Sequence, residues 1–121
     1  MTAIGTYLGI TVDCADPAAL SEFYRAVTGW DASYSSDEFV YLAPASGGAG
    51  LGFQKIENHP RPSWPDDAKQ FHLEFQVADI AEGEKRLVEL GAAKPEFQPG
   101  GDKWVVLTDP AGHPFCISVA A

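Results

Sequence analysis

The two halves of this sequence resemble each other at a fixed spacing. Asp16 and Asp79 are 63 positions apart, and Gly29 and Gly91 are 62 apart. In each half the aspartate precedes apolar residues at helical spacing and the glycine follows them, so that a helix start and a helix stop recur in near register. One unit of this kind has a sheet face that its single helix cannot bury. The repeat therefore predicts two similar units that join in one domain.

The first unit is predicted at about residues 7–56 as a strand, a helix and three strands. Asp16 followed by Pro17 is a typical helix start, and Gly29 is a typical C-terminal glycine. Apolar and polar residues alternate along the first strand. The predicted elements are a helix at 16–29 and strands at 7–14, 30–34, 39–44 and 50–56.

The second unit is predicted at about residues 70–119 and repeats this βαβββ order. Asp79 can cap a helix that Gly91 ends. Residues 57–69 hold three prolines and no usable periodicity, so they are predicted to be a loop joining the units. The expected result is one α+β domain over residues 1–121, whose second unit has a helix at 79–91 and strands at 72–77, 94–98, 103–108 and 114–119.

Composition excludes several classes of partner. The chain has 121 residues, of which 45% are hydrophobic, enough for one globular core. Its net charge of -9 disfavours nucleic acids and anionic membranes, which bind basic surfaces. No apolar run approaches the roughly 20 residues of a membrane span, and the N-terminus lacks signal-peptide features, so a cytoplasmic location is expected. Cys14 and Cys116 are then expected to be reduced, buried thiols.

Two longer motifs carry a family resemblance. The stretch D-P-x-x-L-x-x-F-Y-x-x-x-x-G-W runs from Asp16 to Trp30, and W-V-V-L-T-D-P-A-G-H-P-F-C runs from Trp104 to Cys116. With the doubled unit, they resemble the vicinal oxygen chelate superfamily of glyoxalase I, bleomycin resistance proteins and extradiol dioxygenases. The similarity is closest to small glyoxalase-like domains, with His113 where asparagine is usual. It implies a curled, cup-shaped mixed sheet with helices outside and ligand inside.

The resemblance also implies where a metal would bind. Metal-dependent members use four side chains, from the first and last strands of both units. These positions fall on Gly9, Gln54, His72 and Cys116. Only His72 is a retained family ligand, and a hard divalent ion prefers a richer set of oxygen and nitrogen donors. We therefore expect no metal cofactor at this set, and a divalent metal is the minor alternative. Glu74 and Asp13 could add oxygen ligands, but they lie two residues further along their strands, about 7 Å away.

The polar face of the strand at 72–77 is the main candidate for chemistry. Leu73, Phe75 and Val77 alternate with polar residues. The resemblance implies that these polar residues face into the cup. Glu74 and His72 are the candidate catalytic residues, with either one as a base. The candidate ligand-binding residues are Thr11, Asp13, Gln54, Trp64, Gln76 and Cys116. The plainer alternatives are a hydrogen-bonded interior His72, solvated carboxylates at Glu74 and Asp13, and a small buried hydrophobe at Cys116.

Aromatic residues divide into core and surface candidates. Phe23 and Tyr24 fit the buried face of the first helix. Trp64 lies among prolines of the connecting loop, where the local pattern offers no core, so it is a candidate lid or interface anchor. Trp104 is expected to pack within the sheet. The loop tryptophan is thus the aromatic residue expected to contact a ligand.

Two functions follow from these features. The first is a protein that binds a small molecule in the cup without a complete metal site. The acidic net charge favours a cationic ligand. The alternative is a lyase, isomerase or epimerase of this superfamily that uses Glu74 or His72 as base. A minor branch is a glyoxalase-like enzyme whose metal is completed by another subunit. Exposed edge strands favour association, so a homodimer is expected.

Overall fold

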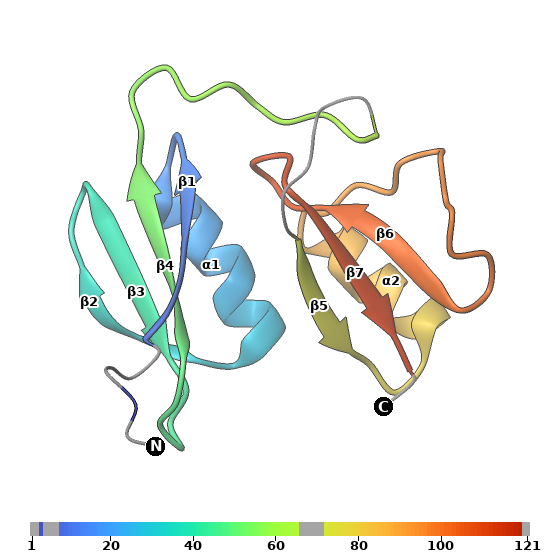
Figure 1. The fold of residues 1–121 in the computed structure, drawn as a ribbon, viewed down its shortest axis with the longest axis horizontal. Helices are drawn as coiled ribbons and strands as arrows, with labels where there is room; N and C mark the ends of the chain where they lie inside the picture. The colour runs from blue at the N-terminus through green and yellow to red at the C-terminus, as the bar shows by residue number, and fades with distance from the viewer. Residues whose placement is uncertain (1–2, 4–7, 66–71, 120–121) are drawn as a thin grey trace. The chain divides into compact units, whose positions relative to one another are not determined.

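The computed structural model describes residues 3, 8–65 and 72–119. The chain divides into two compact units, Met1–His59 and Pro60–Ala121, and each has its own sheet and helix (Figure 1). The boundary between the units falls inside the loop predicted at 57–69. The predicted start of the first strand at residue 7, part of that loop and the predicted start of the second unit at residue 70 lie outside the described residues.

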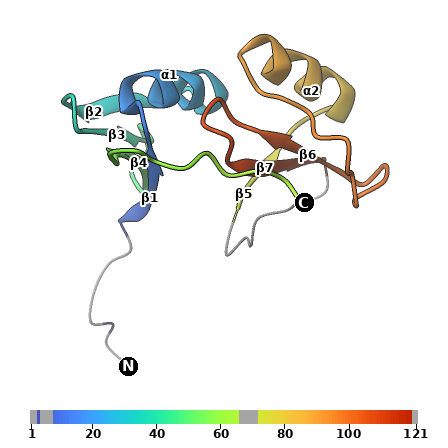
Figure 2. The ribbon, with the colours of Figure 1, turned by 90° about the horizontal axis from the view of Figure 1, so that it is seen from above.

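The first unit is a four-stranded sheet with one helix. Its strands follow the order β1-β4-β3-β2, with β1 and β4 parallel and the other pairs antiparallel. The helix covers one face of this sheet (Figure 2). All five predicted elements are present, with these bounds: β1 Gly9–Cys14, α1 Pro17–Thr28, β2 Asp31–Ser35, β3 Phe39–Ala43 and β4 Gly50–Lys55.

Local sequence signals account for the limits of α1. The Asp16 carboxylate accepts a hydrogen bond from the Ala19 backbone N–H at 3.2 Å, which satisfies one of the free donors at the helix start. Gly29 has φ 75° and donates its N–H to the Arg25 carbonyl at 2.8 Å, which ends the helix in a left-handed conformation. The apolar face between these caps is buried through Leu20, Phe23 and Tyr24.

The second unit is a three-stranded sheet with one helix. Its order is β5-β7-β6, with β5 parallel and β6 antiparallel to the central β7. Asp79 caps the helix by accepting from the Glu82 N–H at 3.0 Å, and the helix covers one face of the sheet (Figure 2). The bounds are β5 Leu73–Gln76, α2 Ile80–Glu89, β6 Trp104–Thr108 and β7 Pro114–Ser118.

The predicted strand at 94–98 does not form, which is a correction to the sequence analysis. The outer edge of β6 instead hydrogen-bonds to the backbone of Ala93, which forms an isolated bridge, and to the side chain of Gln98. Ala93 and Thr108 exchange backbone hydrogen bonds of 2.9 and 2.8 Å. Further along, the Gln98 side chain accepts from the Val106 N–H at 2.9 Å and donates to the Val106 carbonyl at 2.8 Å. Prolines at 95 and 99 lack the N–H donors of a regular ladder, so this amide replaces a backbone partner.

Replacing Gln98 by alanine is expected to lower the free energy of unfolding by about 1–3 kcal/mol, because the buried Val106 loses both hydrogen-bond partners on that edge. Urea denaturation followed by circular dichroism measures the change. Gln76→Ala is the control, since Gln76 is exposed. A Gln98→Ala protein as stable as this control would show that the edge of β6 does not depend on the amide.

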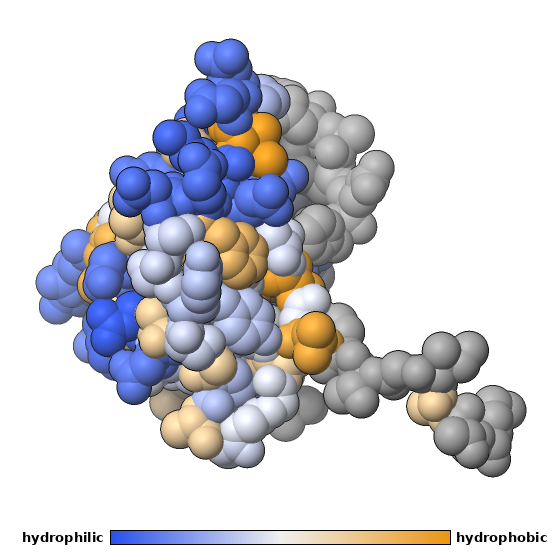
Figure 3. All heavy atoms as spheres, turned by 90° about the vertical axis from the view of Figure 1, so that its left-hand side faces the viewer, coloured by the Kyte–Doolittle hydropathy of each residue, from blue (hydrophilic) through white to orange (hydrophobic). Residues whose placement is uncertain are grey.

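The surface around the edge strand β2 is polar. All five residues of β2 are exposed. Figure 3 views the side on which β2 lies in Figure 1, and hydrophobic residues appear there as separate spots among hydrophilic and intermediate ones. A second chain could therefore pair with the backbone hydrogen-bonding groups of this edge, but it would find no continuous apolar area there. The homodimer stays a prediction.

None of the described helices has both the length and the hydropathy to cross a membrane.

Candidate functional site

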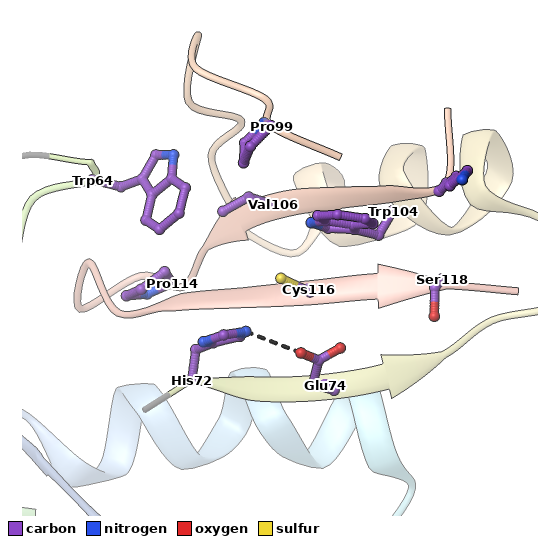
Figure 4. Close-up of a pocket in the computed structure, with 10 residues that line it drawn as sticks. Trp64, His72, Glu74, Pro99, Trp104, Val106, Pro114, Cys116 and Ser118 are labelled. Atoms are coloured by element: carbon purple, nitrogen blue, oxygen red, sulfur yellow. Dashed lines mark hydrogen bonds and ion pairs between the residues drawn. The ribbon is translucent and has the colours of Figure 1, made fainter. Parts of the chain in front are cut away.

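A hollow of about 570 Å³ lies in the second unit, on the sheet face turned away from α2 (Figure 4). Its size is within the range of small-molecule sites, roughly 300–1,000 Å³. Most of the lining is apolar, and the polar groups are few. The lining residues are Trp64, His72, Glu74, Pro99, Lys103, Trp104, Val106, Pro114, Cys116 and Ser118.

Strand alternation brings these residues to one face. Successive side chains of a strand point to opposite sides of the sheet, and the residues between the lining positions of β6 and β7 form the core. Phe115 and Ile117 of β7 are fully buried, and so is Leu107, which follows Val106 on β6. The register then aligns the exposed side: Cys116 is opposite Glu74 of β5 and Val106 of β6. Three strands thus contribute one row of side chains to the floor of the hollow.

His72 and Glu74 form a close pair on this floor. The Nε2 atom of His72 lies 2.9 Å from Oε2 of Glu74, and Figure 4 shows the two side chains pointing toward each other. Their side chains are 42% and 67% exposed, so His72 is not an interior histidine. Two residues of strand rise separate the backbones of His72 and Glu74, about 7 Å, but their long side chains on the same face bridge this distance.

Cys116 lies beside this pair as a nearly buried thiol. It is 6% exposed, and burial together with the nearby charge of Glu74 raises the pKa of its thiol to about 11. The thiolate is the nucleophilic form of cysteine, and at this pKa the thiol form dominates in neutral solution. Both cysteines are buried and neither takes part in a disulfide, as expected from the sequence.

Trp64 reaches the hollow from the connecting segment. Its indole Nε1 donates to the Phe97 carbonyl at 3.0 Å, and the two rings lie 6.1 Å apart. Nearby, Arg61 donates to the Pro110 carbonyl at 2.6 Å. These contacts attach the segment around residues 61–64 to the second unit. The tryptophan singled out from the sequence therefore lines a pocket, while its contact with a ligand stays a prediction.

Trp104 is the main site residue that sequence reasoning missed. It was expected to pack within the sheet, but it is 38% exposed and lines the hollow. The reason is its position on β6, two residues before Val106 and therefore on the same face. Gly100 leaves room for the indole, since a Cβ there would lie 2.5 Å from the Trp104 ring. Extending the period-two pattern from residues 72–77 to the last two strands would have found it.

The remaining predicted site residues divide between the units. Gln76 is exposed and pairs in register with Ser118 at the end of β7, but it is not among the lining residues of the hollow. Thr11, Asp13 and Gln54 are exposed on the sheet of the first unit. Asp13 and Gln54 are register partners there, so these three residues form their own polar group. That they share one cup with the second unit's residues stays a prediction.

The four family positions do not fit a hard divalent metal ion. Gly9 has no side chain, and the structure leaves no space for one: its φ is 147°, and a Cβ would lie 2.3 Å from the Gly50 carbonyl oxygen. Gln54 offers only an amide, a weak ligand beside carboxylates and imidazoles. These four positions therefore supply too few good ligands for such an ion.

The fold and the pocket define the class of this protein. Paired sheet-and-helix units, with ligand-type side chains on the open face of a sheet, are those of the vicinal oxygen chelate superfamily. The model of the glyoxalase-like domain family matches residues 9–118, and the chain belongs to that family. No protein among the curated sequences matches the chain.

Solved structures with this fold include several glyoxalase-related proteins. A possible glyoxalase from Bacillus cereus is 19% identical, with a TM-score of 0.66, over 96% of this chain and 99% of that one. A glyoxalase/bleomycin resistance protein/dioxygenase family enzyme from Burkholderia phytofirmans is 21% identical, with a TM-score of 0.68, over 93% and 97%. A fosfomycin resistance protein from Listeria monocytogenes, in complex with Mn(II) and dihydroxypropylphosphonic acid, is 18% identical, with a TM-score of 0.70, over 98% and 93%. At these identities the similarity shows the fold alone.

Proposed function

We propose that this protein binds a small molecule that carries a flat apolar group and an amine, in the hollow of the second unit. The observation that carries the proposal is the combination of apolar walls with the His72–Glu74 pair in one cavity of about 570 Å³. Sites of this kind use apolar surface for affinity and a few polar groups for orientation. No metal is required for such binding.

The walls favour a flat ligand. Trp64 and Trp104 both line the hollow, and prolines and Val106 add to its apolar surface. Aromatic rings attract other rings and cations through their faces, by about 0.5–1.5 kcal/mol beyond the area they bury. An aromatic or alicyclic group therefore fits this surface better than an extended polar chain.

The charges favour an amine. Among the described lining residues, Glu74 is the carboxylate, and its side chain is 67% exposed, so a bound ammonium can reach it. The net charge of -9 raises the local concentration of cations around the whole chain. Lys103 also lines the hollow, so the preference for an amine has to come from proximity to Glu74.

Paired probes of equal shape test this function. Phenethylamine and phenylpropionate share a phenyl group and differ in charge, and both can be titrated in EDTA while tryptophan fluorescence is recorded. We expect saturable binding of the amine and weaker binding of the acid. Equal binding of both probes, or no saturable response to either of them or to bulkier aromatic amines, would contradict the proposal.

Glu74→Gln is expected to weaken binding of the amine about three- to tenfold, as for a partly exposed ion pair, and to leave the acid unaffected or more tightly bound. Glu89→Gln is the matched control, because Glu89 is an exposed carboxylate at the end of α2 and outside the hollow. The measured quantity is the ratio of the two dissociation constants in each variant. A ratio that Glu74→Gln leaves unchanged would exclude Glu74 as the amine partner.

The distance of 2.9 Å between His72 and Glu74 favours a second candidate, an enzyme that removes a proton from carbon. In a His–carboxylate pair the carboxylate orients the imidazole and stabilises its charged form, and a positioned base contributes about 10²–10⁴-fold to a rate. Incorporation of deuterium from D₂O into small hydroxyketones, followed by NMR, detects this activity even when the product is not known. Exchange that survives both His72→Gln and Glu74→Gln would remove the proposed base.

A further inference from the structure

Three different metal-ligand atoms converge on the floor of the hollow. A ring nitrogen of His72, a carboxylate oxygen of Glu74 and the sulfur of Cys116 all lie within 4.8 Å of one another. Figure 4 shows His72 and Glu74 grouped with Cys116, which lies on the neighbouring strand β7. All three belong to the second unit, so the group is complete without any residue of the first.

We propose that His72, Glu74 and Cys116 bind a thiophilic divalent cation, Zn²⁺ or its analogues Co²⁺ and Cd²⁺, with a coordination position left open toward the hollow. The site shares His72 and Cys116 with the four positions implied by the superfamily, but Glu74 is at none of those positions, and Gly9 and Gln54 of the first unit take no part. The inference goes beyond the proposed function, which needs no metal.

The geometry is close to that of a zinc site. Zinc bonds of about 2.0–2.3 Å in a tetrahedral arrangement place ligand atoms roughly 3.3–3.8 Å apart. The His72–Glu74 distance is 2.9 Å, and the widest separation in the group is under 4.8 Å, so shifts of about 1 Å complete the arrangement. Cys116 is held on the central strand, whereas the exposed side chains of His72 and Glu74 have room to adjust by rotation.

The donor set selects soft or borderline ions. One sulfur, one imidazole nitrogen and one carboxylate resemble catalytic zinc sites, which have three protein ligands and a water or ligand molecule at the fourth position. Mg²⁺ and Ca²⁺ prefer all-oxygen sites and are poorly served by sulfur. On binding, the Cys116 S–H bond breaks, its proton passes to solvent, and the sulfur electron pair forms the bond to the metal. No oxidation or reduction takes place.

The largely apolar hollow gives the open position a use. Trp64, Trp104 and Val106 border the same cavity as the three ligands. A molecule held by these walls could then reach the metal with an oxygen or nitrogen atom. The metal would thus add a second mode of ligand binding to a pocket that also works without it.

Cobalt titration tests the site directly. Metal-depleted protein is titrated with CoCl₂, and a thiolate ligand gives an intense sulfur-to-cobalt charge-transfer band in the near ultraviolet that histidine and carboxylate ligands do not give. We expect this band to appear at a stoichiometry of one and to disappear when ZnCl₂ is added. Absence of the band, or saturation only at several cobalt ions per chain, would overturn the proposal.

The two cysteines provide a matched pair of variants. Cys116→Ser is expected to abolish the band, whereas Cys14→Ser retains it, because Cys14 is buried on β1 and its sulfur contacts the Gln54 carbonyl instead. His72→Gln and Glu74→Gln are expected to keep a weakened band, with affinity reduced at least about tenfold for each lost ligand. Circular dichroism confirms that each variant is folded. A band lost in Cys14→Ser and kept in Cys116→Ser would place the ion elsewhere and refute the site.

Failure of the metal site and failure of the proposed function are distinguishable. The amine titration is carried out in EDTA and involves no metal, whereas the cobalt band appears only when the Cys116 thiolate binds cobalt. A protein that binds the amine but gives no band loses this inference and keeps the proposed function. A protein that gives the band but binds neither probe loses the proposed function and keeps this inference.

Discussion

Replacing Phe115 by alanine is expected to lower the free energy of unfolding by about 3–5 kcal/mol, the usual cost of removing a buried aromatic side chain. Phe115 is 0% exposed on the central strand of the second sheet. Its ring meets Phe75 edge-on at 5.8 Å. The cavity left behind would lie in the core between the sheet and α2, where few neighbours can move to fill it. Urea denaturation followed by tryptophan fluorescence measures the loss.

Phe97→Ala is the control for this substitution. Phe97 is 53% exposed, and the hydrogen bond from Trp64 reaches its backbone carbonyl rather than its ring, so we expect a loss below about 1 kcal/mol. Phe115 stands between Pro114 and Cys116, which line the hollow, so its loss should also weaken probe binding. Equal stability of the two variants would show that the second unit does not depend on this core.

Replacing Asp109 by alanine is expected to cost about 2–4 kcal/mol, because two backbone donors lose a charged acceptor in a buried turn. Asp109 is 1% exposed, and its Oδ1 accepts from the N–H groups of Ala111 and His113, both at 2.9 Å. The turn carries the chain from β6 into β7 and so fixes the register of Cys116 against Val106. Thermal and urea unfolding measure the cost.

Two further substitutions make the Asp109 prediction specific. Asp109→Asn keeps an oxygen acceptor at the same place and is expected to lose about half as much stability as Asp109→Ala. Asp102→Ala removes an exposed carboxylate from the preceding loop and is expected to change stability by less than about 0.5 kcal/mol. An asparagine variant as unstable as the alanine variant would point to the charge of Asp109, rather than its hydrogen bonds, as the stabilising feature.

The helices were predictable because their signals are local. Asp16 and Asp79 each accept from the backbone N–H three residues later, and the two caps determine where α1 and α2 begin. Gly29 ends α1 in the left-handed conformation that glycine adopts readily. These interactions involve residues within one helical turn, so a sequence pattern contains all the information they need.

The strand at 94–98 was predicted wrongly because its partner is chosen at long range. Its residues alternate well enough for a strand, but the edge of β6 is satisfied by the side chain of Gln98 and by the bridge from Ala93. Whether a backbone or a side chain pairs with an edge depends on the path of the loop in space. Local alternation does not determine that path.

The candidate site was predictable in part for the same reason. Period-two alternation placed His72 and Glu74 on one face, and in the structure both line the hollow of the second unit. It did not reveal that their side chains meet at 2.9 Å, nor that Cys116 lies within 4.8 Å of them. The second fact depends on the parallel pairing of β5 with β7, which joins segments about 40 residues apart.

By itself, the sequence determined where the helices start and which strand residues share a face. These properties follow from backbone geometry over a few residues, which alternation and capping fully express. Only the tertiary structure decided which faces meet across strands, since register and loop path depend on contacts between distant segments. For that reason Trp104 and the group of His72, Glu74 and Cys116 emerged from the fold, although every one of these residues was visible in the chain.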